Sequence, residues 1–368
     1  MTAAYDVIVA GGGPVGAACA RELALAGRRV LVLDPDEPRG QAWQAAAGML
    51  APQLEADAED PLLELGLAAR EHYGPLAEAL QESVGSDIGL WREGIAWAAG
   101  SETEAADLRS RVAWQRQQGH LADWLDADEV QSRWPWLGPT AGALWAPHEG
   151  ALEPARLVSA LRDDAIRLGA VFERDAAESV EARGDRVSGV AGRRGRYVAG
   201  DVVLAAGAWT GAIGGVPRPV AVAPVRGQMA AFPWPAGARR AIVYGHGGYL
   251  VARGDEAIAG STMEYAGFQS EVTSAGLARV FAAATALCPT LTSAEVTRTW
   301  AGLRPMTPDG RPIIGAEPQL RGLWYATGHG RNGILLAGLT GLLIKQLVTG
   351  EPAAEDLTPF SPERFWRW

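Results

Sequence analysis

The sequence is poor in the residues that build disulfides, metal centres and basic surfaces. Its two cysteines, Cys19 and Cys288, lie far apart in the chain, so no disulfide framework and no CxxC redox or metal pair is indicated. The five histidines form no cluster, which predicts that there is no metal site. A net charge of −10 argues against nucleic acid as a partner, because nucleic-acid binding needs a basic footprint. We expect a cytoplasmic protein.

Lysine and long apolar runs are also scarce. Lys345 is the only lysine and lies on a predicted apolar helix, which disfavours an enzyme with a pyridoxal-phosphate Schiff base. The start of the chain contains Asp6 and no basic region, unlike a signal peptide. The longest strongly apolar stretch, residues 333–344, is shorter than the roughly 20 residues that span a bilayer. We expect no membrane partner.

The order of predicted elements indicates two interlocked domains in the 368 residues. Residues 5–33 read as strand, glycine turn, helix and strand. Residues 218–263 are rich in proline, glycine and short apolar alternations, which is typical of antiparallel sheet. Helices are predicted over residues 61–84, 101–133, 153–169, 271–287 and 334–348, and a strand over 323–326.

The segment GGGPVG at residues 11–16 fits the G-x-G-x-x-G pattern between a strand and a helix. Gly11 permits the tight turn, Gly13 lets a phosphate approach the backbone, and Gly16 lets the helix pack on the strand. The helix N-terminus then offers N–H groups to a pyrophosphate. Asp34 ends the second strand, where a carboxylate accepts from a ribose hydroxyl. A purely structural glycine turn is the alternative.

Three later segments favour FAD over NAD. The strand and small-residue turn DVVLAAGAW (201–209), which contains Gly207, is the usual returning strand beneath FAD. The small residues AAAGML (45–50) suit a backbone that passes close to a flavin. GHGRNGIL (328–335) opens the last helix.

These residues resemble the glycine oxidase branch of the D-amino-acid oxidase family. The matching segments, spread over nearly the whole chain, are AAAGMLAPQ (45–53), LEPARLV (152–158), AAGAWTG (205–211), PVRGQM (224–229), WAGLRPMTPDGRPIIG (300–315) and GHGRNGILLA (328–337). The resemblance implies an α/β fold: a Rossmann-like FAD-binding domain with an inserted α+β substrate domain that contains a mixed, mostly antiparallel sheet. We assign residues 1–50, 150–217 and 300–368 to the FAD-binding domain, and 51–149 and 218–299 to the substrate domain.

The resemblance also implies a non-covalent FAD and the residues that hold it. Asp34 and Ala177 meet the adenosine end, Ala47 to Met49 line the isoalloxazine, and residues 329–335 close over it. Asp34 replaces the commoner glutamate, and residues 41–44 lack the hydroxyl groups often found there. The full cofactor set is Gly11, Gly13, Pro14, Val15, Gly16, Asp34, Ala42, Trp43, Ala47, Gly48, Met49, Ala177, Gly207, His329, Gly330, Arg331, Asn332, Gly333, Ile334 and Leu335.

Arg304 is the predicted anchor of a substrate carboxylate, because a guanidinium offers two parallel charge-assisted hydrogen bonds. A surface arginine in a turn is the alternative. Tyr249 matches a family tyrosine that bonds the same carboxylate or gates the entrance; the alternative is a tyrosine packed in the sheet. A hairpin with strands at residues 249–253 and 256–263 and its turn at Gly254-Asp255 places Tyr249 opposite Gly260.

Three further residues complete the predicted substrate site. Arg331 is expected to assist substrate binding or stabilise reduced flavin. Met49 and Met263 are candidate pocket walls, with ordinary core packing as the alternative. The regular hairpin register puts Met263 on the sheet face opposite the predicted tyrosine.

The activity implied by the resemblance is oxidative deamination of glycine or another small D- or N-methyl amino acid. A hydride passes from Cα to flavin N5, the imine hydrolyses to an oxo acid and ammonia, and oxygen is reduced to hydrogen peroxide. The family's imine is used in thiamine (thiazole) biosynthesis, and the family suggests a homo-oligomer. The alternatives are a flavin-dependent D-amino-acid dehydrogenase, a sarcosine-type amine oxidase with another acceptor, a non-enzymatic flavin subunit and an NAD dehydrogenase.

Overall fold

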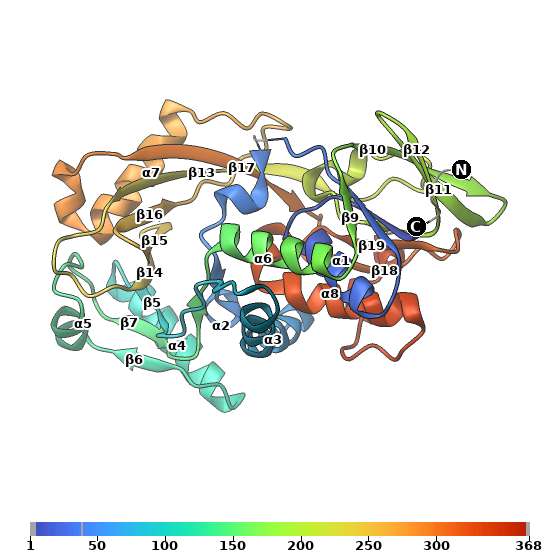
Figure 1. Ribbon diagram of the computed structural model, residues 1–368. Coiled ribbons are helices and arrows are strands. Elements are labelled where there is room, and N and C mark those ends of the chain that lie inside the picture. The colour runs from blue at the N-terminus through green and yellow to red at the C-terminus, as the bar shows by residue number, and fades with distance from the viewer. Residues whose placement is uncertain (1–4, 38–39, 366–368) are drawn as a thin grey trace.

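The computed structural model describes residues 5–37 and 40–365. The four residues before Tyr5, which belong to the segment judged unlike a signal peptide, lie outside this range. Two large sheets organise the described residues, and Figure 1 shows them at opposite ends of an elongated molecule.

The first sheet has eight strands and a parallel centre. Two apolar runs, VIVA and VLVL, are buried on both faces, which is typical of strands in a parallel sheet covered by helices. The central order is β9–β2–β1–β12–β19, with every neighbouring pair parallel. These strands are β1 (Tyr5–Ala10), β2 (Val30–Leu33), β9 (Val171–Glu173), β10 (Ala177–Arg183), β11 (Arg186–Gly192), β12 (Arg196–Leu204), β18 (Ile313–Ala316) and β19 (Leu323–Thr327).

The second sheet has nine strands and is mixed. Its order is β3–β17–β13–β16–β15–β14–β5–β7–β6, and only the β3–β17 and β14–β5 pairs are parallel. This confirms the predicted fold class. The strands are β3 (Gly40–Gln41), β5 (Ile95–Ala98), β6 (Asp123–Leu125), β7 (Ala143–Ala146), β13 (Ala223–Pro233), β14 (Ile242–Gly245), β15 (Gly248–Arg253), β16 (Glu256–Gly260) and β17 (Arg298–Met306), while β4 (Met49–Leu50) pairs separately with β8 (Gly150–Ala151).

Helices cover the sheets and supply their cores. The α helices are α1 (Pro14–Leu25), α2 (Pro52–Glu55), α3 (Pro61–Val84), α4 (Glu102–Gln117), α5 (Ala127–Arg133), α6 (Pro154–Arg167), α7 (Ser274–Leu287) and α8 (Gly333–Thr349). Short 3-10 helices lie at Ala42–Ala45, Gly207–Ala212, Pro289–Ser293, Gly330–Asn332, Thr358–Phe360 and Pro362–Phe365. Helices α1, α3, α6 and α8 share one core with β1 and β2, whereas α7 packs on the nine-stranded sheet (Figure 1).

The last helix is long and apolar enough to cross a membrane. With the turn before it, it spans Gly330–Thr349, 20 residues, and 56% of its apolar window is buried inside the protein. The helix packs against α1 and α3, and its buried side chains belong to the core of the first sheet. A helix that is apolar on all sides and covered by protein is a core helix.

Two predicted elements differ from the observed ones. The predicted helix over residues 101–133 is split into α4, β6 and α5, because Gly119 adopts a left-handed conformation (φ +81°) just after α4. The second hairpin strand ends at Gly260 and does not continue to Met263, although Tyr249 pairs with Gly260 as predicted. The domain division stays a prediction; β17 crosses its boundary at residue 300 and lies wholly in the nine-stranded sheet.

Candidate active site

A single large cavity of about 1010 Å³ contains most of the predicted site residues. It extends from the glycine turn after β1 to the side chains of β15 and β17. Gly16 and Leu335 are the two predicted residues outside its lining. The predicted residues that line it are Gly11, Gly13, Pro14, Val15, Asp34, Ala42, Trp43, Ala47, Gly48, Met49, Ala177, Gly207, Tyr249, Met263, Arg304, His329, Gly330, Arg331, Asn332, Gly333 and Ile334.

The three glycines of the turn have different surroundings. Gly11 has φ +104°, and a Cβ there would lie 2.5 Å from the carbonyl oxygen of Ala205. At Gly16 a Cβ would lie 1.9 Å from the carbonyl oxygen of Gly11, so helix α1 packs directly on the turn. At Gly13 the nearest atom to a Cβ is Trp43 Cδ1, at 3.6 Å. The space above Gly13 therefore lies within the cavity, at the N-terminus of α1, where a phosphate is favoured.

Asp34 is held by a network at the end of β2. Its Oδ2 accepts from the backbone N–H of Gly12 at 3.0 Å and from Arg162 Nη2 at 2.6 Å. Its Oδ1 accepts from the backbone N–H of Asp36 at 2.8 Å. Arg162 also donates from Nε to the carbonyl of Gly12 at 2.8 Å. The carboxylate is thus fixed in direction beside the glycine turn.

The middle of the cavity is lined by tightly packed backbone. Gly48 has φ +84°, and a Cβ there would lie 2.0 Å from the carbonyl oxygen of Leu152. His329 is buried on the other side, with Nε2 3.1 Å from Thr340 Oγ1. Burial lowers the pKa of His329 to about 3, so the ring is neutral at ordinary pH. Close backbone and a neutral ring suit a planar cofactor.

The far end of the cavity carries Arg304. Its Nη1 donates to the carbonyl of Thr262 at 3.1 Å, and its Nη2 donates to Ser261 Oγ at 2.6 Å. The guanidinium lies over Gly227, where a Cβ would come within 2.0 Å of Nη1. A guanidinium has five N–H donors, so three remain for a ligand in the cavity.

Aromatic and charged side chains continue from this guanidinium. The ring of Tyr249 lies 5.5 Å from that of Tyr244, whose hydroxyl donates to Glu55 Oε1 at 3.1 Å. Burial raises the pKa of Tyr249, and burial together with Glu55 raises that of Tyr244 well above its usual value. Arg331 Nε lies 2.9 Å from Glu55 Oε2, an ion pair whose direction is poor for a hydrogen bond. Arg331 is half exposed, with 53% of its side chain accessible.

The other predicted substrate residues differ in their surroundings. Met263 lines the cavity although 53% of it is exposed, because the chain leaves β16 before reaching it. The hairpin register therefore does not determine where Met263 points. Met49 lines the cavity from β4. Leu335 is buried, and a Cβ on Gly66 of α3 would contact its Cδ2 at 3.4 Å.

Several residues of the site were not found from the sequence. Glu55 is the second residue after the matching segment AAAGMLAPQ, and this position was only weak evidence for a place in the site. Tyr244 lies in the antiparallel region without a motif, and Ser261 follows a strand in a loop. Arg162 lies on α6, 128 residues from Asp34. Only the folded chain brings Glu55, Tyr244 and Ser261 to the cavity, and Arg162 to Asp34.

Comparison with known families gives a match over most of the chain. The profile of the family described as FAD dependent oxidoreductase matches residues 6–347. The glycine oxidase of Geobacillus kaustophilus is 36% identical, over 99% of this chain and 98% of that protein. A bifunctional protein ThiO/ThiG of Synechocystis is 35% identical, over 99% of this chain and 55% of that longer protein.

Solved structures agree with this match. The crystal structure of glycine oxidase from Geobacillus kaustophilus superimposes with a TM-score of 0.92 at 34% identity, covering 99% of both chains. The similarity therefore extends over both sheets and the cavity.

Proposed function

The chain belongs to the family of FAD-dependent oxidoreductases, its cofactor is FAD, and from this and the cavity we propose that it oxidatively deaminates glycine or another small amino acid. The observation that carries the proposal is Arg304 with three unengaged N–H donors at the end of the cavity opposite the glycine turn. An amino acid held there by its carboxylate presents its Cα and amine toward the middle of the cavity.

The cavity fits FAD on two observations. Gly13 leaves open the space at the start of α1 where a pyrophosphate would lie, and Asp34 is directed beside it for a ribose hydroxyl. The backbone near Gly48 and the neutral ring of His329 line the next section, which suits the isoalloxazine. Both cysteines are buried and neither lines the cavity, so neither is placed to form a covalent bond to the cofactor, in keeping with non-covalent FAD. When bound, FAD accepts the hydride that leaves the substrate Cα.

Each side chain of the proposed substrate site has a distinct task. Arg304 binds the carboxylate in a two-pronged arrangement and so fixes the direction of the Cα–H bond. Tyr249 stays a neutral hydroxyl, because burial raises its pKa, and donates a second bond to the same carboxylate. Arg331 is paired with Glu55 at the exposed side, and we assign it to the approach of the substrate. Met49 and Met263 form apolar walls.

The complete reaction gives an oxo acid, ammonia and hydrogen peroxide. For glycine the oxo acid is glyoxylate, formed when water attacks the imine. Because relatives named ThiO/ThiG contain a region similar to this chain, we also propose that the imine serves thiamine biosynthesis. We further propose the domain division given above, a homo-oligomer, and a cytoplasmic enzyme without membrane or nucleic-acid partners.

A substrate panel under air tests the proposal. Glycine, sarcosine and D-alanine are each expected to release hydrogen peroxide, and ethylamine, which lacks the carboxylate, to release far less. Gly247 lines the cavity with open space around its Cα, so we expect sarcosine or D-alanine to react at least comparably to glycine. A rate with glycine far above the rates with sarcosine and D-alanine would contradict the inference that the cavity is wide at Gly247.

The electron acceptor is tested in the same assay. If a quinone or dye supports turnover while oxygen does not, the enzyme is a dehydrogenase, and the oxidase assignment is wrong. If no amino acid reduces the flavin under anaerobic conditions, the proposed reaction itself is wrong.

A further inference from the structure

The Arg304 guanidinium is held by a short segment that belongs to neither of its neighbouring strands. This segment, residues 261–264, leaves β16 and runs alongside β13, where Glu264 forms an antiparallel bridge with Arg226. Within it, Ser261 Oγ accepts from Nη2 at 2.6 Å and the Thr262 carbonyl accepts from Nη1 at 3.1 Å. Both hydrogen bonds fix the plane of the guanidinium, and so the direction of the N–H groups that remain for a carboxylate.

Ser261 also lies beside the second group of the proposed clamp. The phenol of Tyr249 donates to Met229 Sδ at 3.4 Å, and the hydroxyl of Ser261, after the charge of Arg304, opposes the rise in pKa that burial causes at Tyr249. The hydroxyl of Ser261 is therefore placed between Arg304 and Tyr249, and a change in its position would move both groups.

Gln228 on β13 holds the next residue of the segment. Its backbone N–H donates to Thr262 Oγ1 at 3.0 Å. Its amide Nε2 donates to Glu264 Oε2 at 2.7 Å and to Thr273 Oγ1 at 3.0 Å, and its Oε1 accepts from the N–H of Thr273 at 2.7 Å. Gln228 is fully buried, its bond to Thr262 is buried, and its bonds to Glu264 and Thr273 are partly buried. A buried amide with every bond made has one orientation.

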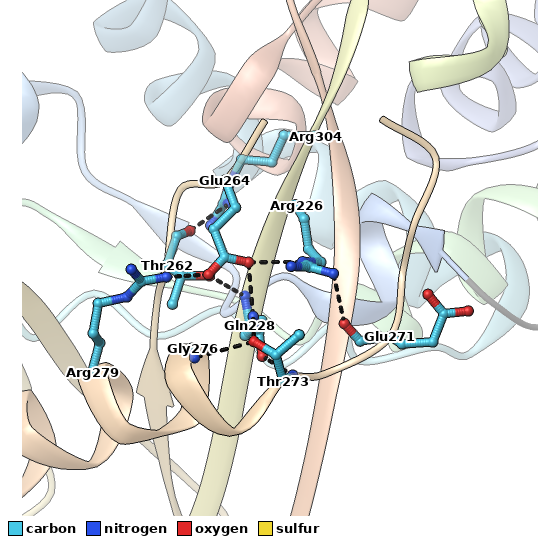
Figure 2. A network of polar contacts seen from close by, with 9 residues as sticks. All are labelled: Arg226, Gln228, Thr262, Glu264, Glu271, Thr273, Gly276, Arg279 and Arg304. Carbon is cyan, nitrogen blue, oxygen red and sulfur yellow. Dashed lines mark hydrogen bonds and ion pairs between the residues drawn. The ribbon is translucent and has the colours of Figure 1, made fainter. Parts of the chain in front are cut away.

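Glu264 closes the network (Figure 2). Its carboxylate accepts from Arg226 Nε at 2.7 Å and pairs with Arg279 of α7. Burial opposes its charged form, but the hydrogen bonds from Gln228 and Arg226 outweigh burial and hold the pKa of Glu264 below its usual value. Its backbone also exchanges two hydrogen bonds with Arg226, at 2.8 and 3.0 Å. Both ends of the segment are thus fixed to β13.

We propose that Ser261 and Gln228 are positioning residues of the carboxylate clamp: Ser261 aligns the guanidinium of Arg304, and Gln228 holds the segment that carries Ser261. This inference rests on the proposed function, because it assigns the clamp to a substrate carboxylate. Ser261 lines the cavity and Gln228 does not, and we assign neither of them a contact with the substrate carbon that reacts. Their effect is transmitted through the angle and position of Arg304, and loss of about 1 Å in position is costly for hydride transfer.

The experiment measures binding of acetate to the FAD-loaded enzyme through the change in flavin absorbance. Acetate has the carboxylate but no amine, so it reports the clamp without turnover. Ser261→Ala and Gln228→Leu are each expected to raise the Kd of acetate by about 10-fold, and to lower kcat/KM for glycine in parallel. Ser261→Thr restores the hydroxyl and is expected to recover most of the affinity.

Gln115→Leu is the matched control. Gln115 is also fully buried, and its Nε2 donates to the carbonyl of Gln53 at 2.8 Å, away from the 261–264 segment. Both glutamine variants are expected to lower the Tm, but only Gln228→Leu is expected to weaken acetate binding. Equal acetate affinity in the two glutamine variants would assign Gln228 to stability alone and contradict its positioning role.

Arg304→Ala separates this inference from the proposed function. If Arg304→Ala abolishes acetate binding while Ser261→Ala keeps the parent affinity within about two-fold, the clamp stands and the positioning role of Ser261 is wrong. If Arg304→Ala binds acetate as the parent does, the clamp itself is wrong and the proposed function loses its anchor. Ser261→Ala removes a single hydroxyl from a half-buried side chain, so the test does not depend on whether Gln228→Leu folds.

Discussion

The two ends of the cavity recognise their ligands by different means. At the cofactor end the contacts come from backbone and from one contiguous turn, residues 11–16, in which each glycine meets a different neighbour. At the substrate end they come from side chains, with Arg304 on β17, Tyr249 on β15 and Glu55 on α2. In the glycine turn an added Cβ therefore meets either the protein or the space expected for the cofactor, whereas the substrate end depends on single side chains and what holds them.

Gly13→Val is expected to have the largest effect. Because only Trp43 lies near a Cβ at this position, at 3.6 Å, the valine fits the protein and occupies the space expected for the pyrophosphate. The variant should fold and be purified without FAD, which absorbance and the Tm of the apoprotein would show. Full flavin occupancy in this variant would contradict the assignment of the glycine turn to the FAD site.

Gly16→Ala sharpens the same prediction. Here the added Cβ would lie 1.9 Å from the Gly11 carbonyl oxygen, so the helix cannot keep its place on the turn. We expect little folded protein, in contrast to the soluble apoprotein of Gly13→Val. If both variants gave the same folded apoprotein, the distinction drawn between the two glycines would be wrong.

Arg304→Ala is expected to have the next largest effect, at the other end of the cavity. Removing a guanidinium that pairs with a carboxylate costs about 2–5 kcal/mol, so kcat/KM for amino acids should fall roughly 30-fold or more. FAD content should not change. Arg304→Lys should recover little, because lysine keeps the charge but not the two-pronged geometry.

An amine without a carboxylate is the control for this variant. Oxidation of ethylamine, slow in the parent, should be unaffected by Arg304→Ala. If the variant oxidised amino acids as well as the parent does, the carboxylate would be bound elsewhere, with Arg331 as the next candidate.

The contrast between the two ends also explains what the sequence revealed. The turn at residues 11–16 is contiguous, and the hydrophobic runs beside it predict its strand and helix, so its place in the fold followed from local pattern. The antiparallel region and the pairing of Tyr249 with Gly260 also followed from alternation and a two-residue turn. Local chemistry was enough in both cases.

The supporting residues of the site lay beyond such reasoning. Asp34 and Arg162 are 128 residues apart and meet only because α6 packs against α1. Ser261 belongs to no sequence motif. Its role depends on where the chain leaves β16, and the regular hairpin pattern predicted a later end for this strand than the structure has. Hydrogen bonds between residues far apart in the chain follow no periodicity, so no sequence pattern predicts them.

Gly227→Ala is expected to have a smaller effect than removal of the guanidinium. The new Cβ would lie 2.0 Å from Arg304 Nη1 and must displace the guanidinium, while Gly227 needs no left-handed backbone. A displacement of this kind should lower kcat/KM for glycine by about 10-fold or more and weaken acetate binding to match. Gly200→Ala on β12 is the control, because its nearest neighbour, Arg186 Nη2, is 3.7 Å away. Unchanged acetate affinity in Gly227→Ala would show that the guanidinium can accommodate the new Cβ without weaker binding of the carboxylate.

Tyr249→Phe is expected to have the smallest effect. A neutral hydroxyl donor contributes about 0.5–1.5 kcal/mol, so the Kd of acetate should rise roughly 2- to 10-fold while Arg304 still binds. Burial raises the pKa of Tyr249 above its usual value of 10.0, so the hydroxyl keeps its proton at both pH 7 and pH 9, and acetate is ionised at both. The ratio of the two dissociation constants should therefore be the same at about pH 7 and pH 9.

The matched control is Tyr325→Phe, which removes a buried hydroxyl that donates to Glu317 at 2.9 Å outside the cavity lining, and it should leave acetate binding unchanged. A ratio between Tyr249→Phe and the parent that shrinks toward one as the pH rises to 9 would mean that Tyr249 loses its proton in this range. The phenol would then repel the carboxylate it is proposed to bind. In that case Arg304 and, to a smaller extent, Ser261 would set the pH dependence of the clamp, because both favour the ionised phenol, and the substrate end would be governed by charge on Tyr249 as well as by the geometry of Arg304.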